Sequence, residues 1–511
     1  MLQNNLFTSL PSVFNTLIFL EFFFYSATFL IFFFIFFCFS LYCYFSTKKY
    51  LNFFVDNDFF LLSIKNILNK FFIFLALFLV CVFYLYFYYL VNEPFKFTCI
   101  NNLDAFNDFF FFNSNTDQFC INIYSLLILF LCLFTGVIAL STISNLYEER
   151  KSRLYIIFLQ FLLTIFGFVT ANDLIFFFFF YELLLLGSFL IVYYGSYIKK
   201  STQASIFFVI WTQLGSLLVL LSISYVYYIT NTTNFFLLKF YPFNNFDCWV
   251  IYSLLFFGFG FKLPIWPFHY WLTKTHVEAL SGFSIYLSGF LVKTALFGFY
   301  KVNNFINFEI NTNFFLVFLI VGVVDASIKM WGQTDLKKLV AYCTIQEMNL
   351  IAIFFLKGDS SVIFYGFVFN FTHAFLSTLM FYLVECIYIR YFSRSVFLVN
   401  GVFFTFPVLG FCIFLMTVVF SGIPGTFKFV CEFFVFNTVL SFSWILCIFL
   451  IFFVNVLGLI GFSKNWLNAL FCAPSISFRN LSLDLSKKET LIIFLNFFFL
   501  IGFSYINIFI L

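Results

Sequence analysis

Long apolar runs recur along almost the whole of this 511-residue chain, and they constrain its fold more than any other feature. A run of about 18 residues or more can cross the roughly 30 Å hydrocarbon core of a bilayer as one helix. The chain is 63% hydrophobic and only 9% charged, against roughly 25% charged in soluble domains. We therefore expect an all-α integral membrane protein, and a soluble enzyme is excluded.

Apolar runs separated by short polar segments predict about fourteen transmembrane helices. The predicted spans are 12–46, 70–92, 121–145, 154–171, 173–197, 203–230, 249–272, 280–300, 313–328, 339–356, 361–389, 401–441, 443–463 and 490–511. Loops on the cytoplasm-like side of a membrane collect Lys and Arg. Loops after odd-numbered spans hold 19 of the 26 basic residues and loops after even-numbered spans hold 4. This alternation supports the predicted number of spans and places both termini on the non-basic side.

The composition points to an organelle and away from a redox site. Phenylalanine supplies 99 residues, as expected for an AT-rich genome, and residues 1–20 contain no charged side chain. A transit peptide is Arg-rich, so we expect synthesis inside a mitochondrion. The 13 cysteines form no CxxC pair, which argues against disulfides and iron–sulfur ligation, and no nucleotide-binding glycine motif occurs. We expect no cofactor to be bound by this chain.

Several ionisable residues fall inside the predicted spans, where each costs about 2.5–3.5 kcal/mol on insertion scales. Together they would exceed the roughly 5–15 kcal/mol net stability of a typical fold, so they cannot face lipid unpaired. They are Glu21, Glu182, Lys262, Lys293, Asp325, Glu347, Lys428 and Glu432, accompanied by His269 and His373. A buried file of acids and bases that relays protons is favoured over purely structural ion pairs, because nearby carboxylates can switch a buried lysine between holding and releasing a proton.

Two of the charged spans also contain helix breakers. Lys262 is followed by Pro264 and Pro267, and Glu432 follows the Gly-Ile-Pro-Gly stretch 422–425. Broken helices at membrane depth are tolerated where they line a hydrated cavity. We therefore predict discontinuous seventh and twelfth helices.

The distance of five helices between the two breaks predicts two inverted five-helix repeats. Residues 1–150 would hold the first three helices, 151–310 the first repeat and 311–465 the second. Residues 466–511 would form a connection and the last helix.

Residues 261–279 read FKLPIWPFHYWLTKTHVEA. They resemble the KxPxxPFHxWLPxAHxEAP signature of the antiporter-like subunits of NADH:ubiquinone oxidoreductase, respiratory complex I, and the HVEA element is similar to the chain-4 members. Residues 291–298, 333–342 and 422–432 resemble the LLKxxxYG, QTDIKRLIAYSS and GLPGTxNFVGEF patterns of the same family. The resemblance continues through His373, Arg390 and Arg394, and it covers about residues 170–440.

The resemblance implies a proton channel. In this channel Glu182 pairs with and tunes Lys262, Lys293 is the central relay, and His373 connects Lys293 with Glu432. The candidate relay residues are Glu182, Lys262, His269, Lys293, Glu347, His373 and Glu432.

The resemblance also implies where the chain works and with what. NADH, FMN, iron–sulfur clusters and ubiquinone would be bound by other subunits, whose electron transfer drives the pumping. The partners would be the antiporter-like chains 2 and 5 and membrane lipids, without nucleic acid, in the mitochondrial inner membrane.

The sequence departs from the family patterns at several positions. Glu347 occupies the position of the histidine in SxxHMG, and a glutamate has an unperturbed pKa of about 4.3 against 6.5 for histidine. Lys428 lies one helical turn before Glu432 and can pair with it at i,i+4. Thr273 and Leu280 replace family prolines.

Two other functions stay open on the sequence alone. One is an Mrp-type cation/proton antiporter subunit, which shares the lysine and glutamate pattern; the HVEA element and the organelle-like composition argue against it. The other is a membrane scaffold with an inactive channel, supported only by the substitutions at Thr273, Leu280 and Glu347. The motif-matching Lys262 and Lys293 argue for a working channel.

Smaller patterns have simpler interpretations. Asp325 and Lys329 lie one turn apart and are expected to form a surface pair. Glu21 is expected to be a lone structural acid. His276 and Glu278 have no third ligand nearby, so we expect a contact with a neighbouring subunit instead of a metal site.

Overall fold

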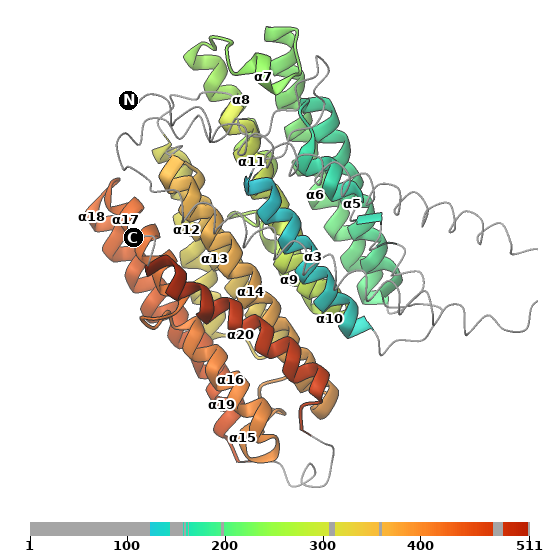
Figure 1. Cartoon of the computed structure of the whole chain (residues 1–511), viewed down its shortest axis with the longest axis vertical. Helices are drawn as coiled ribbons and strands as arrows, with labels where there is room; N and C mark the ends of the chain where they lie inside the picture. The colour runs from blue at the N-terminus through green and yellow to red at the C-terminus, as the bar shows by residue number, and fades with distance from the viewer. Residues whose placement is uncertain are drawn as a thin grey trace, which may run out of the picture. The chain divides into compact units, whose positions relative to one another are not determined.

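The computed structural model describes residues 123–143, 157, 160–161, 163–195, 199–305, 312–356, 360–473 and 484–508 (Figure 1). They all fall within the compact unit Phe71–Leu511. These residues are helices joined by turns, and two isolated bridges are the only β pairings among them. Within the described ranges, eight helices are long and apolar enough to cross a membrane. The chain is an all-α integral membrane protein; Glu21 and the spans 12–46 and 70–92 lie outside the described residues.

The helices up to residue 305 overlap the predicted spans, except the short α7, which lies between two of them. They are α3 (Ile123–Ile143), a helical stretch at 163–170, α5 (Leu174–Gly195), α6 (Lys199–Thr230), the short α7 (Phe235–Leu238), α8 (Asn245–Lys262), α9 (Tyr270–Glu278), α10 (Ser281–Tyr286), the π-helical η3 (Leu287–Leu291) and α11 (Val292–Phe305).

The later helices also overlap the predicted spans. They are α12 (Asn313–Trp331), α13 (Leu336–Leu356), α14 (Ser360–Tyr391), α15 (Val402–Thr405), α16 (Pro407–Phe420), α17 (Phe427–Leu440), α18 (Trp444–Ile451), the π-helical η4 (Phe452–Gly458), α19 (Leu459–Phe471) and α20 (Lys487–Ile508). The predicted span 401–441 contains α15, α16 and α17.

The first predicted break is confirmed. Helix α8 ends at Lys262, just before Pro264 and Pro267, and the chain becomes helical again at Tyr270. Proline has no N–H and its ring clashes with the preceding turn, so it ends a helix. The Trp271 indole N–H donates a 2.6 Å hydrogen bond to the Phe261 carbonyl, which satisfies an acceptor that the interrupted helix leaves free.

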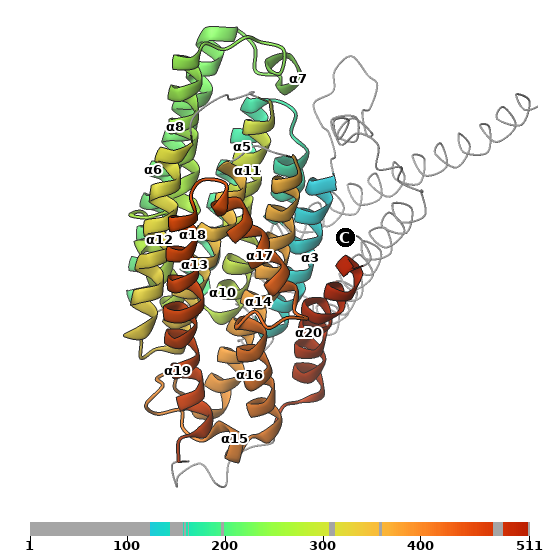
Figure 2. The same cartoon turned by 90° about the vertical axis from the view of Figure 1, so that its left-hand side faces the viewer.

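The second predicted break is also confirmed. Helix α16 ends at Phe420 and α17 begins at Phe427 (Figure 2). Gly422 and Gly425 have φ angles of +66° and +99°, a left-handed conformation that glycine adopts without a Cβ clash. The Gly-Ile-Pro-Gly stretch therefore separates two half-helices.

A third irregularity in the helices is a π-helical segment, and no proline in the sequence predicts it. The π segment η3 joins α10 to α11 and ends two residues before Lys293. A Cβ atom on Gly289 would lie 2.7 Å from the methyl carbons of Thr135 and Thr378. Close packing against α3 and α14 thus accompanies the wider turn.

The polar interior is carried by three buried helical segments. Residues 281–304 and α13 are buried along almost their whole length, and α14 along most of its length, with Phe364, Tyr388 and Ile389 exposed. Helix α13 contacts both α12 and α14 (Figure 1). Large apolar side chains on α6, α18 and η4 are exposed, as suits contact with lipid or another apolar surface. The charged residues of the interior are thus enclosed by helices and separated from the apolar exterior.

Candidate functional site

All seven candidate relay residues lie in the described part of the chain. Their contacts and charge interactions divide them into three groups. Glu182 and Lys262 form the first group, and His269 forms the second with Asp325 and Lys329. The third group contains Lys293, Glu347, His373 and Glu432. It also includes Lys428, which lies on the same helix as Glu432 and contacts both Glu432 and Glu347.

Lys262 occupies the C-terminal end of α8, where the helix dipole favours a cation. It is buried, and its Nζ lies 4.2 Å from the centroid of the Tyr181 ring, a cation–π distance. Glu182 follows Tyr181 on α5, and its charge acts on Lys262, but the two make no ion pair within 4.0 Å. One buried carboxylate oxygen of Glu182 has no hydrogen-bond partner. The direct pairing that the resemblance implies is not formed here, and the two residues interact at longer range.

Lys293 is completely buried in α11. Its ammonium donates to the backbone carbonyl of Ser288, which belongs to the π segment, so the irregular turn supplies an acceptor to the buried cation. The charge of Glu347 acts on Lys293, and the charge of Lys293 acts on His373. Two groups that can take or return a proton therefore interact electrostatically with Lys293.

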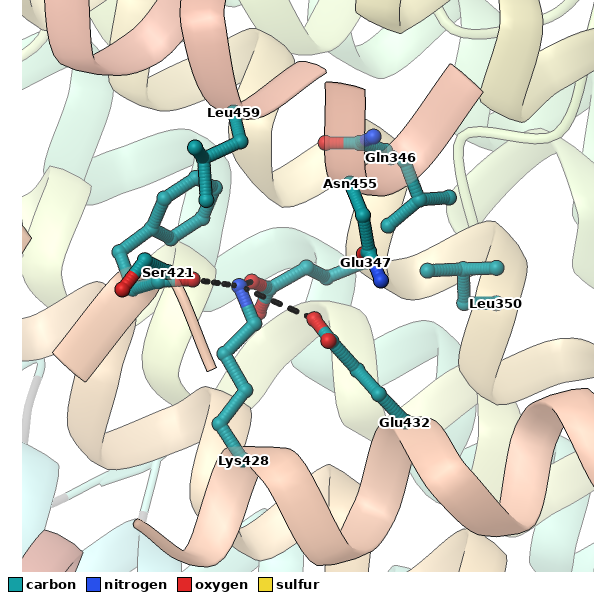
Figure 3. Close-up of a pocket in the computed structure, with 10 residues that line it drawn as sticks. Gln346, Glu347, Leu350, Ser421, Lys428, Glu432, Asn455 and Leu459 are labelled. Atoms are coloured by element: carbon teal, nitrogen blue, oxygen red, sulfur yellow. Dashed lines mark hydrogen bonds and ion pairs between the residues drawn. The ribbon is translucent and has the colours of Figure 1, made fainter. Parts of the chain in front are cut away.

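Lys428 lies between two carboxylates (Figure 3). Its Nζ is 2.7 Å from Glu347 Oε1 and 3.4 Å from Glu432 Oε1. It also donates a 2.7 Å hydrogen bond to the Phe420 carbonyl, one of the acceptors left free where α16 ends. The predicted i,i+4 pair of Lys428 with Glu432 is confirmed, but Glu347 on α13 is the nearer partner.

His373 faces the other oxygen of the same glutamate. Its Nε2 lies 3.8 Å from Glu347 Oε2, and neither ring nitrogen has a hydrogen-bond partner. Glu347 thus points one oxygen at His373 and the other at Lys428. Contacts within 4.0 Å thus link His373 on α14, Glu347 on α13, and Lys428 and Glu432 on α17. Lys293 on α11 joins this run through charge interactions with Glu347 and His373.

A cavity of about 10 Å³ adjoins this run, with room for about one water molecule. Its lining comes from the end of α16 and from α13, α17, η4 and α19. The lining residues are Gln346, Glu347, Leu350, Phe420, Ser421, Lys428, Glu432, Val454, Asn455 and Leu459. A water there could carry a proton between groups that do not touch.

His269 belongs to a separate triad. Its Nε2 lies 3.1 Å from Asp325 Oδ2, and Lys329 Nζ lies 2.6 Å from the same oxygen. The predicted i,i+4 pair of Asp325 and Lys329 is confirmed and is partly exposed, and the structure adds to it a histidine that is 3% exposed. His269 makes no direct ion pair or hydrogen bond with the other candidate relay residues, all of which are described.

His276 also differs from expectation. It is completely buried and stacks on Phe381, with ring centroids 4.7 Å apart, so it faces the interior of this chain and not a neighbouring subunit. Within the described ranges, no group of three or more His, Cys, Asp or Glu side chains is placed to hold a metal ion.

Two polar groups of the interior were not singled out in the sequence. Asn349 is completely buried on α13, and its amide donates to the Ile345 carbonyl and, at 3.3 Å, to the Pro264 carbonyl. It therefore ties α13 to the first helix break. The signal for it in the sequence was a polar asparagine inside a predicted apolar span. The free Phe420 carbonyl could not be predicted, because it depends on the residue at which α16 ends.

The glycine at the second break gives a first prediction. Gly422→Ala should lower the stability of the protein by about 1–2 kcal/mol, the cost of a left-handed conformation for a non-glycine residue, with more from the clash. A Cβ at this position would lie 2.9 Å from Glu432 Oε2, whereas one at Gly332 would meet nothing within 4 Å. Thermal unfolding of the assembled complex with Gly422→Ala, compared with Gly332→Ala, measures this difference. Equal stability of the two variants would contradict the assigned backbone role.

Comparison with known proteins identifies the family of this chain. Residues 171–458 match the family described as NADH:quinone oxidoreductase/Mrp antiporter, TM. The chain is 56% identical over 467 residues to NADH-ubiquinone oxidoreductase chain 4 of Paramecium tetraurelia, covering 90% of this chain and 97% of the relative.

Two solved structures share the fold at low sequence identity. A chain of respiratory complex I from Thermus thermophilus with bound NADH is similar with a TM-score of 0.66 and 20% identity, over 75% of this chain and 81% of that one. A chain of the Mrp complex from Dietzia sp. DQ12-45-1b is similar with a TM-score of 0.63 and 18% identity, over 70% and 68%.

The broken helices, the enclosed charges and the apolar exterior define a multi-pass membrane protein of the antiporter-like class. The chain belongs to the NADH:quinone oxidoreductase/Mrp antiporter family and, within it, to the NADH-ubiquinone oxidoreductase chain 4 relatives.

Proposed function

We propose that this chain is a proton-translocating membrane subunit of respiratory complex I. It couples electron transfer from NADH to ubiquinone, carried out in other subunits, to proton movement across the membrane. The observation that carries the proposal is the buried run of titratable side chains from Lys293 to Glu432. Buried ionisable groups are costly in a membrane protein and mark ion pathways.

In this proposal Lys293 is the central proton carrier. When it is charged it donates to the Ser288 carbonyl, and when it releases its proton His373 and Glu347, which interact with its charge, are the groups of the run that would accept it. Glu432 ends the run beside the second helix break. The cavity next to Glu347 and Glu432 offers a site for a bridging water.

The first break holds the other half of the proposed pathway. Lys262 at the end of α8 would load and unload a proton as the influence of Glu182 changes, since a nearby carboxylate favours the charged lysine and burial favours the neutral one. His269, with Asp325 and Lys329, would exchange protons at the partly exposed end of α12.

The proposed architecture has fourteen transmembrane helices with two inverted five-helix repeats at 151–310 and 311–465. Residues 1–150 would hold the first three helices, and 466–511 a connection and the last helix. The two helix breaks, each beside a buried lysine, support this arrangement.

We place the protein in the mitochondrial inner membrane, packed against the antiporter-like chains 2 and 5 and against lipids. The exposed apolar residues of α6, α18 and η4 would face these neighbours. NADH, FMN, iron–sulfur clusters and ubiquinone would be bound elsewhere in the complex, and nucleic acid plays no part.

An Mrp-type antiporter subunit is the second candidate, favoured by the fold shared with the Dietzia chain. The complex I assignment is preferred because the 56% identity to a complex I chain 4 extends over 90% of this chain. A scaffold with an inactive channel is disfavoured by the continuity of the buried run.

Purification of the tagged chain from membranes separates the first two candidates. A complex I subunit should co-purify with NADH:ubiquinone reductase activity and with chains 2 and 5, identified by mass. Recovery of the chain in a small complex that oxidises no NADH and exchanges Na⁺ for protons would support the antiporter and overturn the proposal.

A further inference from the structure

Two residues that depart from the family patterns face each other in the fold. Glu347 stands at the histidine position of SxxHMG, and Lys428 stands at the asparagine position of GLPGTxNFVGEF. They lie on α13 and α17, and Lys428 Nζ is 2.7 Å from Glu347 Oε1. The two changes therefore place an acid and a base in direct contact, and each supplies the counter-charge that the other requires when buried.

The charge balance of this cluster depends on the lysine. Glu347, Lys428 and Glu432 are each less than one-tenth exposed. With all three ionised, the cluster carries one net negative charge, and one added proton makes it neutral. Without Lys428 the same volume would hold two carboxylates, with only the titratable His373 within 4.0 Å of Glu347. Two buried carboxylates that share a site without a permanent cation retain a proton between them.

We propose that Lys428 is a positioning residue of the proton pathway, the shared counter-ion that lets Glu347 and Glu432 take up and release one proton. This inference rests on the proposed function and extends it. The relevant contacts are unequal, 2.7 Å to Glu347 and 3.4 Å to Glu432, so the lysine has a nearer and a farther partner between which to shift.

The directions of the two Glu347 carboxylate oxygens explain how Lys428 changes its partner. A proton that leaves the Nε2–H of a charged His373 binds Glu347 Oε2, which faces that ring at 3.8 Å. The histidine becomes neutral and the glutamate becomes neutral, with no change of redox state. Lys428 then loses its attraction to Glu347 and pairs with Glu432. Departure of the proton by way of the adjoining one-water cavity restores the first pair.

Phe420 keeps the lysine ammonium close to both carboxylates while its stronger partner changes. Its carbonyl accepts a 2.7 Å hydrogen bond from Lys428 Nζ, and its ring centroid lies 3.5 Å from the same nitrogen. Both contacts hold the ammonium at the end of α16 whichever carboxylate is charged. The second helix break thus supplies a fixed support for a cation that two acids share.

The test compares Lys428→Asn, Glu347→His and the double variant in the assembled complex. Protons pumped per NADH oxidised and the pH profile of NADH:ubiquinone turnover are measured. Lys428→Asn should lower pumping roughly fivefold or more and move the turnover optimum up by about one pH unit, because the two carboxylates now retain the proton. The groups that act on the cluster in this profile are Lys293, Cys343, Glu347, His373, Cys431 and Glu432.

The double variant makes the test specific. It removes one carboxylate together with the lysine, so pumping should return to within about twofold of the unaltered chain, and Lys428→Arg, which keeps the charge, should pump better than Lys428→Asn. Unchanged pumping and pH profile in Lys428→Asn would overturn the inference, as would an assembled double variant that pumps no better than Lys428→Asn. If Lys428→Asn does not assemble, the double variant is compared with the unaltered chain: pumping within about twofold supports the inference, and a loss of roughly fivefold or more in the assembled double variant overturns it.

A Lys293→Met variant in the same preparation separates this inference from the proposed function. Loss of pumping in Lys293→Met together with normal pumping in Lys428→Asn would overturn only the role of Lys428. Normal pumping in Lys293→Met would overturn the proposed function itself.

Discussion

Lys293→Met is expected to lower proton pumping and coupled NADH:ubiquinone turnover by roughly tenfold or more, which corresponds to about 1.4 kcal/mol or more in the barrier. Methionine fills a similar apolar volume and carries no proton. Lys293 is completely buried, and its only described hydrogen bond goes to the Ser288 carbonyl, so the substitution removes the proton carrier and leaves the surrounding helices in place. Assembly of the complex should be retained.

Lys301→Met is the matched control. Lys301 lies on the same helix, α11, and is also buried, but its ammonium donates to the Val169 carbonyl and makes no ion pair with the run from Lys293 to Glu432. This variant should pump normally once it is assembled. An equal loss of pumping in both variants would show that any buried lysine of α11 is needed, and the relay assignment of Lys293 would fail.

Arg390→Met is expected to destabilise the protein by about 1.5–3 kcal/mol, the range for losing hydrogen bonds to a charged group, since the Glu489 carboxylate left behind is only partly buried. Arg390 Nη2 lies 2.9 Å from Glu489 Oε2, and it also donates to the Asp484 carbonyl at 3.3 Å. These contacts attach α20 to α14, along which it packs (Figure 1). Glu489 also accepts from the backbone N–H of Ser486 at 2.7 Å, the capping-box arrangement that begins α20.

The measurement is the yield and thermal unfolding of the assembled complex, with pumping per complex as a second readout. A charge exchange, Arg390→Glu with Glu489→Arg, should recover much of the lost stability, and pumping per assembled complex should be unchanged throughout. A fall in pumping at full stability would show that Arg390 takes part in the proton pathway and does not only stabilise the fold.

The sequence was most informative where local chemistry decides the structure. Proline at 264 and 267 and glycine at 422 and 425 end helices for backbone reasons, so both breaks could be predicted. The i,i+4 contact of Lys428 with Glu432 follows from helical spacing alone.

The sequence was least informative where partners come from distant segments. The contact of Lys428 with Glu347 joins α17 to α13, and no local spacing indicates it. The same holds for His269 with Asp325, which turned an expected surface pair into a triad. The π segment before Lys293 depends on tight packing of Gly289 against two other helices. These features are set by tertiary packing, which a periodic pattern does not encode.

The most direct test of the account is the number of protons pumped per NADH oxidised in membranes that carry Lys262→Ala. Lys262 is buried at the first helix break, whereas Lys274, on the next helical segment, is exposed and provides the control Lys274→Ala. The account predicts that Lys262→Ala assembles and loses pumping or coupled turnover, while Lys274→Ala keeps both. Unchanged pumping and turnover in an assembled Lys262→Ala complex would contradict it and leave the chain as a membrane scaffold whose buried charges are structural.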